Sequence, residues 1–243
     1  MSPRDYPDYV TPVTQVYIEG LAGLEELATR LGSIVPWDLH GNIVLMEDFE
    51  SEITEWEDES DGLGSTFSRS STQKYSGDFS AKLYSCGLAN AYTGFIRQLH
   101  YPGQVKYGLF GRFHWDNATQ QILFSAAFYD ETYSYEALIR VDALSNTLAV
   151  ITTDGAFHNI LTGFTTHFPA VYWWSILLTF DLSTNKYCKL YFGNYEYDLS
   201  SVALRRRDSV SFPSAYIDVM IEDTDTDAFT VYVDNIVLVK NVP

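Results

Sequence analysis

The segment from residue 172 to 200 constrains the fold most, because it reads as two strands and two tight turns without a break. Every second residue from Trp174 to Phe180 is large and apolar, an alternation that lets one face of a strand enter a core. Residues 181–185 interrupt it with Asp, Ser and Asn, which favour turns, and the chain returns through residues 187–192. Gly193 and Asn194 supply the next corner. The segment predicts consecutive antiparallel strands, with the 174–180 strand in a core.

The composition supports an all-β fold for most of the chain. Aromatic residues make up 16% of the 243 residues and include 18 tyrosines, and such side chains favour strands. A domain from residue 41 to 243 is long enough to bury a sizeable core, with residues 1–40 as an appended segment. Besides the two strands above, short turns separate predicted strands at residues 42–46, 93–99, 107–115, 121–129, 135–141, 147–152, 215–222 and 230–238.

The turn after Phe180 resembles a known superfamily. Asp181, Ser183, Thr184 and Tyr187, followed by a hairpin and the Tyr-Asp-Leu of residues 197–199, resemble the back-sheet hairpin of concanavalin A-like jelly rolls. That superfamily includes lectins, glucanases and laminin-G domains. The resemblance implies a two-sheet antiparallel jelly-roll sandwich, and a fold does not by itself imply a function.

Both ends of the predicted domain add to this resemblance. The acidic residues 47–50, Trp56 and the Ser-Gly-x-x-Ser-x-x-Leu pattern of residues 76–83 are similar to the opening of jelly-roll carbohydrate-binding modules. Residues 230–238 are similar to their closing strand. The resemblance therefore covers residues 43–240.

The N-terminal 40 residues have a different character. Residues 1–10 read as an extended arm, and Thr11 with Pro12 can begin a helix that Gly32 ends. A helix with this apolar stripe needs a partner surface, either on its own sandwich or on another chain. We expect self-association, for example as a homo-oligomeric trimer, or docking onto a larger assembly, through Tyr17, Leu21, Leu24, Ala28 and Leu31.

A formal net charge of −17 disfavours nucleic acid and anionic membranes as partners. The three arginines at 205–207 form the main basic cluster, and they read as a solvated loop, as a partner for the acids within the chain or as a docking site. Cys86 and Cys188 either pair or stay free. The sequence shows neither the apolar core of a signal peptide nor an apolar run of membrane-spanning length, so we expect the protein to be made in a host cytoplasm.

The sequence predicts no enzyme. The glucanase branch carries Glu-x-Asp-x-x-Glu on one strand, but in residues 217–223 Met220 stands where the middle acid belongs. There is no Gly-x-Ser-x-Gly elbow, and the five histidines are scattered along the chain.

The acidic residues suggest a metal site instead. Residues 47–61 hold nine carboxylates, which are costly together unless water, a cation or a basic partner screens them. The resemblance to carbohydrate-binding modules implies a structural Ca²⁺ that ties the first strand to the last, because hard oxygen ligands suit calcium. The alternative is a solvated acidic loop. By position, the ligands would be Asp48, Glu50, Asp78 and Asp234.

Exposed aromatic rings would be needed to stack on sugars, whereas most aromatic residues of a sandwich belong to its core. The candidates are Trp115, Tyr129, Tyr133, Tyr135 and Trp173.

Together these patterns predict a non-catalytic structural protein of a virion, such as a phage capsid decoration or another component of the virion surface, which contacts itself and other virion proteins. The alternative is a carbohydrate-binding, lectin-like module on a cell or a particle, with glycans as partners. The virion interpretation rests on the arm and helix before a jelly roll, the missing catalytic set and the acidic composition.

Overall fold

The computed structural model describes residues 41–61, 64–88, 91–115, 121–163, 172–222 and 227–242. The compact unit that contains all of them runs from Gly41 to Pro243. The predicted N-terminal arm, helix and oligomerisation residues lie outside the described residues. Within the described ranges there is no helix, so none is long and apolar enough to cross a membrane.

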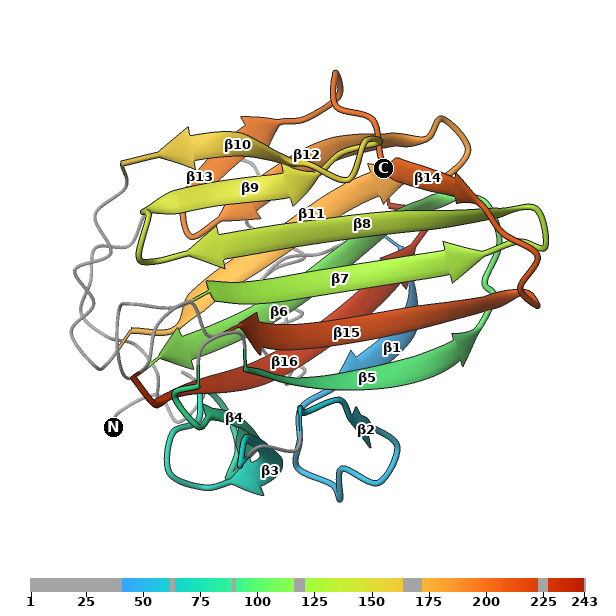
Figure 1. Cartoon of the computed structure of the whole chain (residues 1–243). Helices are drawn as coiled ribbons and strands as arrows, with labels where there is room; N and C mark the ends of the chain where they lie inside the picture. Colours follow the sequence, from blue (N-terminus) through green and yellow to red (C-terminus); the bar gives the residue numbers. More distant parts are fainter. Residues whose placement is uncertain are drawn as a thin grey trace, which may run out of the picture. The chain divides into compact units, whose positions relative to one another are not determined.

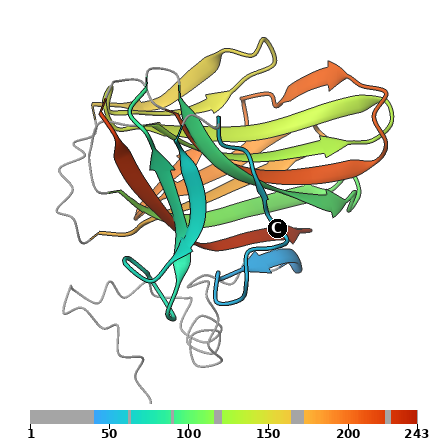
Figure 2. The same cartoon turned by 60° about the horizontal axis from the view of Figure 1, so that its bottom comes forward.

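The described strands form two antiparallel sheets of eight strands each, which lie face to face (Figures 1 and 2). We call them sheet A and sheet B. Sheet A has the order β13 (Tyr195–Asp198), β12 (Lys186–Phe192), β11 (Trp174–Asp181), β6 (Lys106–Trp115), β16 (Phe229–Lys240), β4 (Ser80–Ser85) and β3 (Thr66–Ser70), and β1 (Asn42–Glu47) also pairs with β16. Sheet B has the order β10 (Phe157–Thr162), β9 (Thr147–Ile151), β8 (Tyr133–Asp142), β7 (Gln121–Tyr129), β15 (Ser214–Glu222), β5 (Tyr92–His100) and β2 (Glu57–Asp58), and β14 (Arg205–Asp208) also pairs with β8.

The core fills the space between the two sheets. In β11 the side chains of Ile176, Leu178 and Phe180 are at most 1% exposed and belong to the main hydrophobic cluster, as the alternation predicted. Tyr187 of β12 ties sheet A to sheet B. Its hydroxyl accepts a hydrogen bond from the backbone N–H of Leu138 at 3.2 Å and donates to the carbonyl of Ile151 at 2.9 Å. The predicted two-sheet sandwich is therefore confirmed.

A β-bulge interrupts the long closing strand β16. Asp234 pairs with Arg112 of β6 and Val237 pairs with Phe110, so β16 has one residue more than its partner between these two pairs. Asn235 takes up the extra length with a left-handed φ of 53°, a conformation that Asn tolerates better than most residues. The bulge turns Asp234 and Asn235 toward the 75–79 loop, where both side chains find partners.

All ten strand ranges predicted from the sequence are present. Of the six other described strands, β4 lies in the 76–83 pattern and β13 follows the corner predicted at 193–194, whereas β2, β3, β10 and β14 were missed. Residues 205–207 are not a solvated loop, because they form β14. Arg205 binds Glu136 there at 2.8 Å, so the interpretation of this cluster as an internal partner for the acids is confirmed for that residue. In the described part of the chain Cys86 and Cys188 are free thiols.

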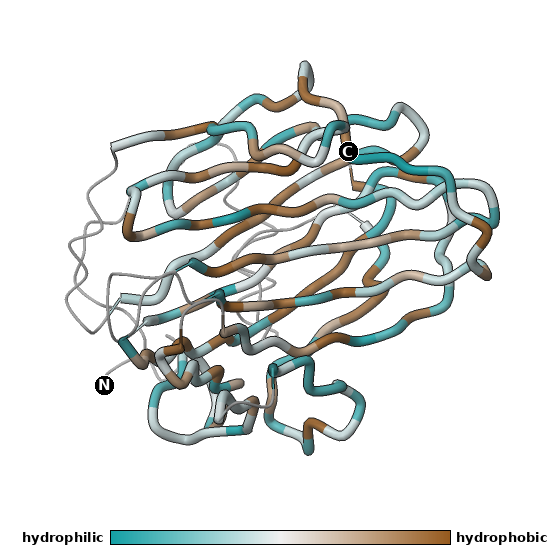
Figure 3. Tube along the Cα trace, viewed as in Figure 1, coloured by the Kyte–Doolittle hydropathy of each residue, from teal (hydrophilic) through white to brown (hydrophobic). Residues whose placement is uncertain are grey.

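The acid-rich stretch after β1 is mostly hydrophilic in Figure 3. Two arginines screen part of its charge. Arg97 of β5 bridges Glu47 and Glu55, and Arg69 of β3 pairs with Glu52.

Candidate functional site

The outer face of sheet B carries a row of polar groups across its central strands. Ile217 and Val219 of β15 face the core, so Asp218 between them faces outward. In register with Asp218 lie Ile96 of β5 and Ser125 of β7. The next outward position along β15 is Tyr216. It is aligned with Gln98 of β5, Ala127 of β7 and, one strand further, Glu136 of β8.

Asp218 stands out on this face because one oxygen of its half-buried side chain is enclosed without a hydrogen-bond partner among the described residues. Its Oδ1 is shielded from solvent and has no hydrogen-bond partner among the residues that the structure describes. Burial raises the pKa of Asp218 to about 8, and the negative charges of Glu59, Glu136 and Glu222 raise it further in the same direction. The free protein therefore keeps Asp218 mostly protonated at neutral pH.

The surroundings of Asp218 come from three parts of the chain. Glu222 lies on the same strand, and Glu136 on β8 is held by Arg205 of β14. Glu59 follows β2, and its backbone N–H donates to the carbonyl of Gly94 on β5 at 3.0 Å, which anchors it beside the sheet. The pKa of Glu59 is also raised, first by burial and then by the charge of Glu57.

Aromatic and apolar side chains lie on either side of Asp218 and the acids around it. The ring of Tyr216 meets the edge of Tyr129 on β7 with 5.7 Å between centroids, and both residues are half-buried. On the other side a small apolar cluster spans β7, β8, β9, β10 and β15. Its members are Leu123, Leu138, Ile151, Phe157 and Met220. The face thus offers rings, hydrogen-bonding groups and apolar surface within one sheet.

The structure corrects the predicted set of sugar-stacking residues. Trp115 and Tyr135 are 2% and 4% exposed and belong to the core, because the alternation of β6 and β8 turns them inward. Tyr133 packs against the same core with the guanidinium of Arg206 4.5 Å from its ring centroid. None of these three rings is open for stacking on a sugar.

The other two candidates lie on opposite sheets. Tyr129 is on the outer face of sheet B. Trp173, just before β11, lies beside the outer face of sheet A, with its ring centroid 5.6 Å from that of His114 and 6.2 Å from that of Tyr75. The predicted aromatic residues therefore do not form one platform.

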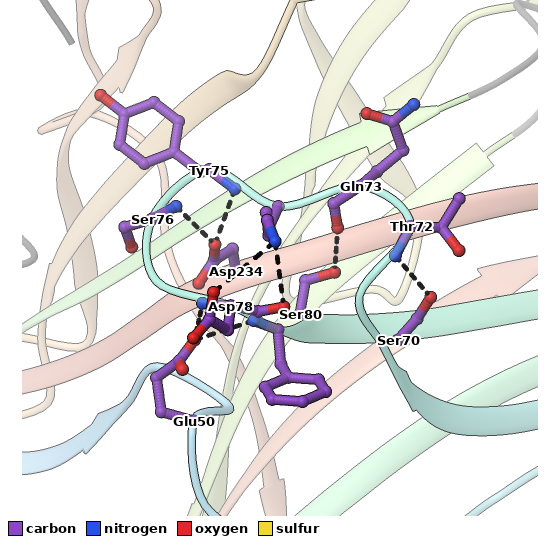
Figure 4. Close-up of polar contacts among 11 residues, drawn as sticks. Glu50, Ser70, Thr72, Gln73, Tyr75, Ser76, Asp78, Ser80 and Asp234 are labelled. Carbon is purple, nitrogen blue, oxygen red and sulfur yellow. Dashed lines mark hydrogen bonds and ion pairs between the residues drawn. The ribbon is translucent and has the colours of Figure 1, made fainter. Parts of the chain in front are cut away.

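Two of the predicted calcium ligands hold one loop from two sides (Figure 4). Oε1 of Glu50 accepts hydrogen bonds from the backbone N–H groups of Asp78 and Phe79, at 2.8 and 2.9 Å. Oδ2 of Asp234 accepts from the backbone N–H groups of Tyr75 and Ser76, at 2.9 and 3.2 Å. The two carboxylates thus tie the 75–79 loop to β16 and to the segment after β1.

The other two predicted ligands do not converge on these carboxylates. Oδ1 of Asp48 accepts from the backbone N–H of Glu50, and Asp78 is exposed beside Lys74. Two N–H donors occupy both lone pairs of each bound carboxylate oxygen, which leaves Oε2 of Glu50 and Oδ1 of Asp234 for other contacts. Among the described residues no group of three or more His, Cys, Asp or Glu side chains could hold a metal ion. The calcium site stays a prediction.

Asp234 also belongs to a buried network behind the loop. Its Oδ1 accepts from the side-chain amide of Asn235 at 2.8 Å, and Asn235 accepts from Arg112 at 2.6 Å. The guanidinium of Arg112 lies 3.8 Å from the centroid of the Tyr75 ring. Burial raises the pKa of Asp234 to about 6, against the opposing effect of the backbone N–H groups of Ser76 and Tyr75.

The sequence did not indicate Asp218 as a site residue. It lies in residues 217–223, a segment that does not match the acidic pattern of the glucanases. One signal was present. Between residues 215 and 221 an acid occupies an outward position of a strand whose inward positions are all apolar. The acids that surround Asp218 could not be found this way, because Glu59 and Glu136 are distant in the sequence.

No family model and no curated protein sequence matches this chain. Solved structures do match. The endo-β-1,4-glucuronan lyase of the fungus Trichoderma reesei is similar with a TM-score of 0.56 at 12% identity, over 82% of this chain and 96% of the lyase. The shared fold is a two-sheet antiparallel jelly roll. The cellulose-induced protein Cip1 is similar to this jelly roll with a TM-score of 0.53 at 15% identity, over 80% and 96% of the two chains.

A third similar jelly roll is a carbohydrate esterase from a Shiga toxin-encoding bacteriophage. Its TM-score is 0.50 at 14% identity, and the match covers 83% of this chain and all of the other. At these sequence identities the structural similarities show the fold alone. The function has to be inferred from the residues of the site.

Proposed function

We propose that the jelly roll is a carbohydrate-binding domain that holds a glycan against the outer face of sheet B. The observation that carries this proposal is the buried Oδ1 of Asp218, which lacks a hydrogen-bond partner in the described structure. An unpaired buried acceptor is costly, and a ligand O–H or N–H would satisfy it. The rings of Tyr216 and Tyr129 beside it can contact the faces of sugar rings.

The geometry also supports binding without cleavage. Asp218, Met220 and Glu222 share the outer face of β15, because successive side chains of a strand alternate between its faces. Met220 separates the two acids along this face and packs in the apolar cluster. The pattern of acids that serves the glucanases is therefore incomplete on this strand, so we infer a binding rather than a hydrolytic role.

The virion role remains a second proposal. It would place the protein on a virion surface as a capsid decoration or other component, and it still rests on the sequence. A glycan-binding face suits a protein on a particle as well as one on a cell, so the two proposals are compatible. Copurification of the protein with assembled particles would test the virion role.

The glycan proposal can be tested with a glycan array followed by calorimetry on the glycans that bind. Asp218→Ala and Tyr216→Ala should each weaken binding at least tenfold. Tyr195→Ala, which removes a 67% exposed ring from sheet A, is the matched control and should bind like wild type. The proposal fails if the array shows no binding, or if Trp173→Ala abolishes binding and both sheet B variants bind normally.

A further inference from the structure

We infer that the glycan held at Asp218 carries free amino groups, as an oligomer of glucosamine does. This inference rests on the proposed glycan-binding function and adds the charge of the ligand. It starts from the charges around the unpartnered Oδ1 of Asp218. The three groups that act on this carboxyl by charge are Glu59, Glu136 and Glu222, and all three are acids.

Three arginines lie on this face, and the exposed Arg207 of β14 is in the row of Ser134 and Tyr129, at the end opposite Glu222. Arg205 is engaged with Glu136 at 2.8 Å. Arg140 of β8 lies in the next row, in register with Leu123 rather than with Ser125, and its guanidinium lies 3.8 Å from the centroid of the Phe157 ring. The strands that pair with β15 bring Ile96 and Ser125 next to Asp218, neither of which carries a charge. An approaching ligand therefore meets Glu59, Glu222 and Asp218 with little compensating positive charge.

A single metal ion does not match this arrangement. The acids lie close enough to act on one another by charge, yet in the described chain they do not gather into a group of three that could hold a metal ion. A ligand with several separated positive charges can instead approach Asp218, Glu59 and Glu222 in turn. An amino sugar oligomer has this property, and its rings can also contact Tyr216 and Tyr129.

Binding of such a ligand must move a proton. Asp218 is mostly protonated in the free protein, because burial and the neighbouring acids raise its pKa to about 8. An ammonium group beside the carboxyl favours the ionised form, since opposite charges lower the pKa of an acid. At pH 5 the amino groups of the ligand are already protonated before binding, so the complex should release up to one proton, from Asp218, to the buffer. A neutral sugar that binds the protonated carboxyl should release none.

The experiment compares two hexasaccharides of the same linkage, the fully deacetylated glucosamine hexamer and its N-acetylated form. Calorimetry at pH 5 in two buffers with different enthalpies of ionisation gives both the affinity and the number of protons exchanged. We expect the deacetylated hexamer to bind at least tenfold more tightly and to release a proton. Asp218→Asn should lose both effects.

Two further variants exchange an exposed acid for an amide, so neither should disturb folding. Glu222→Gln at the exposed end of β15 should weaken binding of the deacetylated hexamer several-fold and still release the proton. Glu196→Gln on β13 of sheet A, also an exchange of an acid for an amide, should bind like wild type.

Several outcomes would overturn the inference. Equal affinity for both hexamers, without proton release, would refute the charged ligand and leave the proposed glycan-binding function intact. Proton release caused by CaCl₂ alone would show a metal site instead. Binding of neither hexamer, together with an empty glycan array, would refute the proposed function as well.

Discussion

At the scale of single residues, Asp218 shows how a carboxyl can remain neutral on a protein that is strongly acidic overall. Its position between Ile217 and Val219 puts it on a sheet face, where burial and three neighbouring acids oppose ionisation. A protonated carboxyl both donates and accepts hydrogen bonds, as a sugar hydroxyl does. In the free protein the side chain of Asp218 can therefore already exchange hydrogen bonds with a hydroxyl group of a ligand.

The raised pKa of Asp218 makes the stability of the domain depend on pH. The folded state keeps a proton up to about pH 8, whereas the unfolded state releases it near pH 4, so the free energy of unfolding falls as pH rises between these values. Each unit of pKa difference corresponds to about 1.4 kcal/mol. Asp218→Asn cannot ionise. Compared with wild type, it should therefore be more stable by about 1–2 kcal/mol at pH 5, and this advantage should grow to several kcal/mol at pH 8.5 in urea unfolding.

Asp208→Asn, at the exposed end of β14, is the control for this prediction and should keep the pH dependence of wild type. Asp234 acts in the same direction between about pH 4 and 6 in all three proteins, so their differences isolate Asp218. A wild-type stability that is constant from pH 5 to 8.5 would contradict the assignment.

At the scale of elements, the 75–79 loop is defined by its contacts more than by its own sequence. Gly77 adopts a φ of +65°, and a Cβ at this position would lie 2.2 Å from Oε1 of Glu50. That oxygen cannot move away freely, because it accepts the two hydrogen bonds that hold Asp78 and Phe79. The conformation of the glycine and the place of the carboxylate therefore depend on each other.

Gly77→Ala should destabilise the domain more than Gly103→Ala. Gly103 also has a positive φ, of +105°, but no described atom lies within 4 Å of a Cβ placed there. Gly103→Ala should cost only the strain of an L-residue at a positive φ, about 1–2 kcal/mol. Gly77→Ala must also displace Glu50, which adds about 1–3 kcal/mol for the backbone donors left unpaired. Equal midpoints of urea unfolding for the two variants would show that Glu50 does not hold the loop.

The predicted calcium ion can be tested at the same loop. If calcium binds through Asp234 and the segment after β1, a chelator should lower the melting temperature of wild type, because a ligand of the folded state stabilises it. Asp234→Ala should melt at a lower temperature than wild type and be insensitive to the chelator. An identical melting curve of wild type with and without chelator would show that hydrogen bonds alone close the loop.

The sequence was a good guide to elements whose inner face is uniformly apolar. β7 and β11 carry an apolar residue at every inward position, and both were predicted nearly residue for residue. β10 and β14 escaped prediction because their sequences lack this signal: β10 is mostly exposed around His158 and Asn159, and β14 is charged along its whole length. Such strands are specified by pairing with a neighbour, which is not visible in a local pattern.

The site could be predicted only in part, for a similar reason. Glu50 and Asp234 were found through a resemblance that concerned their order along the chain. The burial of Trp115 and the isolation of Asp218 depend on contacts between distant segments. Alternation alone shows which residues share a face of a strand, and it cannot tell which of the two faces is the core when both carry aromatic residues.

At the scale of the whole molecule, the sandwich contains its own first and last strands. β1 pairs with β16, and residues from β4 in sheet A and β15 in sheet B share the main hydrophobic cluster. Every strand of the described sheets therefore has a partner that lies after residue 40.

A protein that begins at Gly41 should consequently fold alone and unfold cooperatively, with a thermal stability close to that of the full chain. If the sequence-based prediction for residues 1–40 is right, the full chain sediments as an oligomer and the shortened protein as a monomer. Aggregation of the shortened protein alongside a monomeric full chain would instead assign residues 1–40 to the stability of the domain.

The pairing of β1 with β16 also determines how the domain responds to tension. Asn42, where β1 begins, pairs with Lys240, where β16 ends, so the chain enters and leaves the sandwich at the same point. A force applied between residues 41 and 242 therefore loads the hydrogen bonds of this pair one after another, as in opening a zipper, instead of all together. We therefore expect β1 to separate from β16 at a lower force than the one needed to separate the inner strands.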